Sequence, residues 1–170
     1  EFTPDDIDQI LSKKDVKGSG WAQYIHLVSG GGHPQLAIAI IQSLANSGWD
    51  LKEFQTLERL LKGTPEVNEI RKRVRERLLK ELPDDSRKLI ERLSLQVGGF
   101  NRELAIDLGK VSPPIEDSGF ILDNLTGSWI DQTENNRFNL SPLLSDFAAK
   151  TLTTNEKEKF LSAIADSLTK

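Results

Sequence analysis

The chain has 170 residues, of which 37% are hydrophobic and 28% are charged, and its formal net charge at pH 7 is −4. This composition is typical of a folded, soluble protein, and the acidic balance argues mildly against a nucleic-acid-binding domain. The absence of cysteine excludes disulfides and thiol chemistry, and no apolar run approaches the ~18 residues that span a bilayer. We therefore expect a cytoplasmic protein without a membrane partner.

The sequence contains no methionine, even at its first position. We therefore expect the chain to be part of a longer protein, and some of its function to depend on segments outside it. Glu1-Phe2 is either native sequence or a remnant of cloning, and the sequence does not decide between the two.

Helical patterns fill residues 1–82. Thr3-Pro4-Asp5-Asp6 begins the first pattern, because threonine caps a helix, proline suits the first turn and acidic side chains favour the N-terminus. Further helices are predicted at 21–28, from Pro34 to Asn46, from Asp50 to Gly63 and from Pro65 to Leu82. The helix after Pro34 is apolar on most of its faces, so we expect it to form the buried centre of a small bundle.

A glycine-rich stretch, Ser29-Gly30-Gly31-Gly32-His33-Pro34, separates the second and third of these helices. One interpretation is a tight turn, in which the glycines provide backbone freedom and Pro34 starts the next helix. The other interpretation is a turn that contacts a nucleotide. The turn alone does not decide between them, because the second interpretation depends on a resemblance in the rest of the chain.

The helix predicted from Pro65 to Leu82 carries a run of basic side chains. They are Arg71, Lys72, Arg73, Arg75, Arg77 and Lys80. Such a run could bind phosphate or nucleic acid. Acidic side chains are interspersed with it, so we favour a solvated helix face. The acidic residues are Glu66, Glu69, Glu76 and Glu81.

The organisation changes at Leu82-Pro83-Asp84-Asp85, where Asp84 or Asp85 can cap a new helix. Helical patterns follow at 84–95, 101–108 and 115–125, then a β-hairpin at 128–140, then helical patterns at 141–152 and 155–168. Three short helices followed by a hairpin is the order of a winged helix.

The sequence therefore predicts a mainly α fold in three parts. Residues 1–82 form a small helical bundle, and residues 83–152 form a winged helix with one short β-hairpin. Residues 153–170 form a C-terminal helix that leads toward a missing downstream region.

Gly32-His33-Pro34-Gln35-Leu36 resembles the Gly-x-Pro motif of the NB-ARC and related STAND signal-transduction ATPases. In that family the motif opens a helix of the lid, next to the nucleotide-binding domain, and its proline packs on adenine. A helical lid followed by a winged helix is also the family's order downstream of the P-loop domain. The resemblance implies that Gly32, His33 and Pro34 contact nucleotide.

The stretch from Phe138 to Ala148 resembles the segment that carries the family's Met-His-Asp motif, whose histidine contacts the ADP β-phosphate. Here Ser141 replaces the histidine and Pro142 replaces the aspartate. A serine hydroxyl can still donate one hydrogen bond to a phosphate, so the resemblance adds Ser141 to the nucleotide-binding residues. The alternative is that Ser141-Pro142 simply starts a helix.

The residues that perform chemistry in that family are absent from this sequence. It has no Gly-x-x-x-x-Gly-Lys-Ser/Thr phosphate loop, and no histidine–cysteine–acid cluster has metal-ligand spacing. We therefore expect no enzymatic activity and no cofactor in this chain itself. The resemblance implies that ATP or ADP with Mg²⁺ binds to the parent protein, and that the partners are the parent's own P-loop domain and neighbouring protomers.

Two other functions stay open. The first is a protein-interaction scaffold without any nucleotide role. The second is a DNA-binding winged helix, in which the helix at 115–125 would enter the major groove. That stretch carries Glu116, Asp117 and Asp123 but no lysine or arginine, so we expect no specific nucleic-acid partner.

Overall fold

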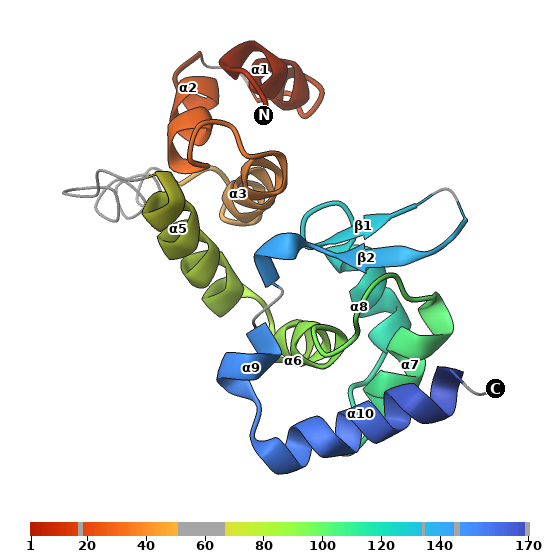
Figure 1. Cartoon of the computed structure of the whole chain (residues 1–170). Helices are drawn as coiled ribbons and strands as arrows, with labels where there is room; N and C mark the ends of the chain where they lie inside the picture. The colour runs from red at the N-terminus through yellow and green to blue at the C-terminus, as the bar shows by residue number, and fades with distance from the viewer. Residues whose placement is uncertain (17–18, 51–66, 134, 145–146, 169–170) are drawn as a thin grey trace. The chain divides into compact units, whose positions relative to one another are not determined.

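The computed structural model describes residues 1–16, 19–50, 67–133, 135–144 and 147–168. The chain divides into two compact units, Glu1–Glu81 and Leu82–Lys170. The described part is mainly helical, with one small antiparallel hairpin (Figure 1). The predicted mainly α fold is therefore confirmed. None of the helices in these ranges is long and apolar enough to cross a membrane.

The first unit is built around a buried helix. Its helices are α1 (Pro4–Ser12), α2 (Ser19–Val28), α3 (Pro34–Asn46) and α5 (Val67–Glu81). Helix α3 packs against both α2 and α5 (Figure 1). Its apolar side chains are almost completely buried, which confirms the predicted centre of the bundle. They are Leu36, Ala37, Ala39, Ile40, Ile41 and Leu44.

Local signals explain where α1 begins. The Thr3 hydroxyl accepts a hydrogen bond from the Asp6 amide, and the Asp6 carboxylate accepts one from the Thr3 amide, so both members of a capping box are present. Pro4 occupies the first turn as predicted. The helix predicted between Asp50 and Gly63 lies outside the described residues.

The second unit begins with three helices followed by the hairpin. The helices are α6 (Asp84–Leu93), α7 (Arg102–Lys110) and α8 (Ser118–Leu125). The hairpin consists of β1 (Ile130–Gln132) and β2 (Phe138–Leu140). Ile130 lies opposite Leu140, and the far edge of β2 pairs with the loop before α7 through Phe138 and Phe100. A 3₁₀ turn (Pro142–Leu144), α9 (Phe147–Thr151) and α10 (Thr154–Leu168) follow, and α10 packs on α7.

Three sequence-based expectations were wrong in detail. The cap of α6 is Pro83 rather than Asp84 or Asp85, because the helix already begins at Asp84. Helix α8 begins at Ser118, since Asp117 has a left-handed backbone conformation that a helix cannot include. The helix expected from 141 to 152 consists of the 3₁₀ turn and the short α9 instead.

A buried arginine holds the second unit together. Arg92 of α6 is only 2% exposed, and its guanidinium donates to the carbonyl oxygens of Leu108 (2.7 Å), Val111 (2.9 Å) and Pro113 (2.5 Å). It also lies over the Phe160 ring of α10, 4.7 Å from the ring centre. One side chain thus joins α6, the end of α7 and α10, and it donates to the carbonyls of Val111 and Pro113 in the loop that follows α7.

We predict that Arg92→Ala strongly destabilises the chain, because several carbonyls lose their donor at once. The free energy of unfolding should fall by about 3 kcal/mol, as expected when buried acceptors are left unsatisfied. Denaturant unfolding followed by circular dichroism measures the change. Arg87→Ala is the control, since Arg87 pairs with Asp84 at the surface of the same helix and should cost less than about 1 kcal/mol. Equal losses in both variants would contradict the assigned role of Arg92.

Candidate functional site at the glycine turn

The turn between α2 and α3 consists of consecutive glycines with positive φ. The φ angles of Gly30, Gly31 and Gly32 are +69°, +81° and +81°, a region that other residues rarely adopt. The Gly31 and Gly32 amides both donate to the His26 carbonyl at 3.0 Å, and the Gly32 amide also donates to the Ser29 hydroxyl at 3.1 Å. The turn is therefore closed by its own hydrogen bonds.

Two segments distant in the sequence also fix this turn. The Phe2 amide donates to the Gly32 carbonyl at 2.7 Å. Arg71 of α5 donates to the Gly30 carbonyl from Nη2 at 2.8 Å and from Nε at 3.2 Å, and its Nη2 lies 2.6 Å from Glu1 Oε1. The hydrogen bond and charge of Arg71 lower the pKa of the Glu1 carboxyl, so this ion pair is present at neutral pH.

Arg71 is the residue of the site that sequence reasoning missed. It was assigned to a solvated basic face together with its neighbours on the same helix. A solvated basic face describes its neighbours Lys72 and Arg73 better, because both lie near Glu69 at exposed positions. Arg71 is different because its partner, the Gly30 carbonyl, is 41 residues away, and no local pattern predicts such a contact.

Gly31 and Gly32 differ in the room that each would leave for a side chain. A Cβ atom on Gly32 would lie 1.9 Å from the Phe2 carbonyl oxygen, a severe clash. A Cβ atom on Gly31 would meet nothing within 4 Å. Gly32 is therefore required by packing as well as by its φ angle, whereas Gly31 is required only by φ and presents an open backbone.

His33 and Pro34 connect the turn to α3. Pro34 is half-buried and occupies the first turn of the helix, as predicted. Nδ1 of His33 is buried and makes no hydrogen bond within the described part of the chain. Burial, and to a lesser degree the nearby charge of Arg71, lowers the pKa of His33, so the imidazole is neutral at pH 7.

The four predicted nucleotide-binding residues belong to two units, which are described separately. Gly32, His33 and Pro34 are consecutive in the sequence and lie in this turn of the first unit, and Ser141 lies in the second unit, directly after β2. Ser141 is 1% exposed, and its amide donates to the Trp129 carbonyl at 3.0 Å. A ligand would reach the Ser141 hydroxyl only after local rearrangement.

Metal binding has no support in the described ranges, where no group of three or more His, Cys, Asp or Glu side chains could hold an ion. Comparison with known proteins adds no family: no protein-family model, curated protein or solved structure matches the chain.

We predict that alanine is tolerated better at position 31 than at position 32. Both substitutions place a side chain at φ +81°, which costs about 1–2 kcal/mol. Gly32→Ala additionally forces the Phe2 carbonyl away, so its free energy of unfolding should fall further than that of Gly31→Ala. Urea unfolding of the two variants gives the comparison. Equal stabilities would mean that the contact with Phe2 does not constrain the turn.

We also predict that His33 makes the stability of the chain depend on pH. Because its pKa is lowered in the folded state from the ordinary 6.5, the unfolded chain takes up the proton first as the pH falls. The stabilising contribution is therefore present above pH 6.5 and is lost at lower pH. Unfolding free energies at pH 7.5 and 5.5 should differ more for the wild type than for His33→Gln. An unchanged difference in the variant would contradict this.

Proposed function

We propose that the chain is a regulatory module, lid and winged helix, of a nucleotide-switch ATPase of the STAND type. In this proposal Pro34 packs on the adenine of a nucleotide that the parent's P-loop domain holds, with ATP or ADP and Mg²⁺ as its ligands. The module closes on the nucleotide in the resting state and moves away on exchange, which frees the parent to assemble with neighbouring protomers.

The observation that carries the proposal is a fixed turn next to which Arg71 is paired with Glu1 and His33 is uncharged. Hydrogen bonds from Phe2 and Arg71 fix the backbone of the turn, so ligand binding would cost little conformational entropy there. A surface with an open glycine and a proline ring suits the flat face of a base.

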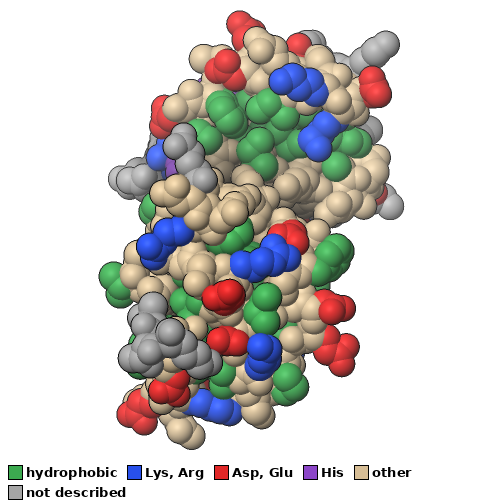
Figure 2. All heavy atoms as spheres, turned by 90° about the vertical axis from the view of Figure 1, so that its right-hand side faces the viewer, with side chains coloured by type: hydrophobic (Ala, Val, Ile, Leu, Met, Phe, Trp, Pro, Cys, Tyr) green, Lys and Arg blue, Asp and Glu red, His purple; other side chains and the backbone are tan. Residues whose placement is uncertain are grey.

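The competing functions have weaker support. Helix α8, which would enter DNA in a winged helix, carries no basic side chain, and its Asp123 is paired with Arg102 of α7. Acidic and basic side chains are interspersed on the face drawn in Figure 2, rather than gathered into a basic patch. A protein-interaction scaffold fits the helical architecture, but it gives no reason for a half-buried proline in the same turn as an open glycine.

The test is the rate of ADP release from the longer protein that contains this chain. Pro34→Lys should accelerate release, because a charge would be desolvated against the base without a partner. Ser141→Ala should have a much smaller effect, since at most one hydrogen bond worth about 0.5–1.5 kcal/mol is lost. Fluorescent ADP displaced by excess unlabelled nucleotide gives both rates.

Thermal melts of the isolated chain separate a nucleotide effect from a folding effect. The first turn of α3 does not depend on proline, so Pro34→Lys should melt close to the wild type. If the variant unfolds the chain and leaves ADP release unchanged, the turn is purely structural. The scaffold function would then be preferred.

A further inference from the structure

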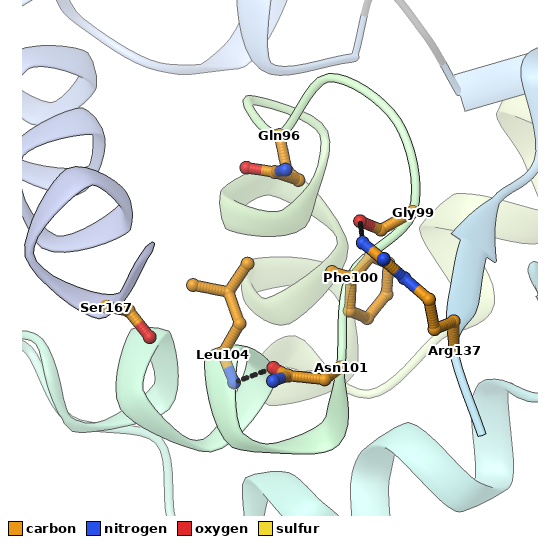
Figure 3. A pocket seen from close by; sticks show the side chains of 7 residues that line it. All are labelled: Gln96, Gly99, Phe100, Asn101, Leu104, Arg137 and Ser167. Atoms are coloured by element: carbon orange, nitrogen blue, oxygen red, sulfur yellow. Dashed lines mark hydrogen bonds between the residues drawn. The ribbon is translucent and has the colours of Figure 1, made fainter. Parts of the chain in front are cut away.

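A second candidate site lies within the second unit, where three segments meet around a pocket of about 300 Å³. The loop before α7, Arg137 directly before β2 and the end of α10 each contribute to it (Figure 3). Its volume is at the lower end of the range of small-molecule sites. The lining residues are Gln96, Gly99, Phe100, Asn101, Leu104, Arg137 and Ser167.

Hydrogen bonds fix the walls of this pocket. The amide of Phe100 donates to the Phe138 carbonyl at 2.8 Å, and the amide of Phe138 donates back at 2.7 Å, so the loop is joined to β2. The Asn101 side chain accepts from the Leu104 amide at 2.9 Å and caps α7. Pocket geometry therefore does not depend on a ligand to order it.

Arg137 supplies the positive charge of the pocket. Its Nη2 donates to the Gly99 carbonyl at 2.8 Å, which holds the guanidinium beside the loop (Figure 3). A Cβ atom at position 99 would lie 2.8 Å from Asn139 Oδ1, so the Asn139 side chain would have to shift, and 3.6 Å from Arg137 Nε, which is an ordinary contact. A guanidinium with five N–H donors can bind a carboxylate besides one carbonyl.

The rest of the lining sets the kind of ligand. None of the described lining residues is acidic, although the chain as a whole has a net charge of −4. Phe100 and Leu104 are apolar and each only 2% exposed, whereas Arg137 is exposed. A ligand with an anionic head and a short apolar body would place its head at Arg137 and its body over Phe100 and Leu104, whose 2% exposure leaves only a small apolar contact, so Arg137 provides the main interaction.

We propose that this pocket binds small organic carboxylates with an apolar chain. Such a ligand would join the loop before α7, β2 and α10, and thus stabilise the second unit. The proposal is independent of a nucleotide role for the glycine turn, since the pocket uses none of the residues around Pro34.

The test uses hexanoate as the probe and the whole chain labelled with ¹⁵N for NMR titration. Hexanoate should produce saturable shifts centred on the amides of Gly99, Phe100 and Asn101, and the neutral isostere hexanamide should bind at least about tenfold more weakly. Arg137→Gln should weaken hexanoate binding by about tenfold, as expected for one hydrogen bond between charged groups. Ser167→Phe, which fills the pocket without changing charge, should abolish binding.

Arg102→Gln is the matched control, because it removes an equal charge from an exposed arginine of the same unit that does not line the pocket. It should bind hexanoate like the wild type. The proposal is overturned if no saturable shift occurs, if hexanamide binds as well as hexanoate, or if Arg102→Gln weakens binding as much as Arg137→Gln. Spectra of the free variants verify that each one is folded.

Discussion

The first unit depends on a backbone constraint: the chain must pass from α2 to α3 through residues with positive φ. Only glycine adopts such angles without strain, and three in succession would leave an isolated segment with many conformations to lose on folding. The structure offsets this cost with hydrogen bonds that converge on one short turn: the Phe2 amide and Arg71 donate to it, and the His26 carbonyl accepts from it. Because the turn is fixed, α3 enters the bundle in a single orientation with its apolar faces buried.

Arginine side chains bind backbone carbonyls at several places in the described part of the chain. Arg71 binds the Gly30 carbonyl, Arg92 binds carbonyls at the end of α7, and Arg137 binds the Gly99 carbonyl. Irregular backbone leaves acceptors that helices and strands would otherwise satisfy, and a guanidinium can reach several of them at once. The burial differs, however. Arg92 is enclosed and can only be structural, whereas Arg137 is exposed and keeps one side toward solvent.

Sequence patterns predicted the features that depend on neighbours in the chain. The cap at Thr3 and the apolar faces of α3 follow from residues three or four positions apart. The roles of Arg71 and Arg92 were not predictable, because their acceptors are 41 and 16–21 residues away. The pocket was missed for the same reason, since Arg137 and Ser167 meet the loop before α7 only in the folded unit.

The two candidate sites differ in charge, and this difference determines what each can bind. At the glycine turn, Arg71 is paired with Glu1, and burial keeps His33 neutral. In the pocket, Arg137 faces a lining of amide, hydroxyl and apolar groups whose described members include no acid. An uncharged aromatic base is compatible with the first site, and a carboxylate with the second. A desolvated charge requires a partner of opposite sign. A carboxylate would therefore lose more solvation free energy at the glycine turn than at the pocket, where Arg137 can pair with it.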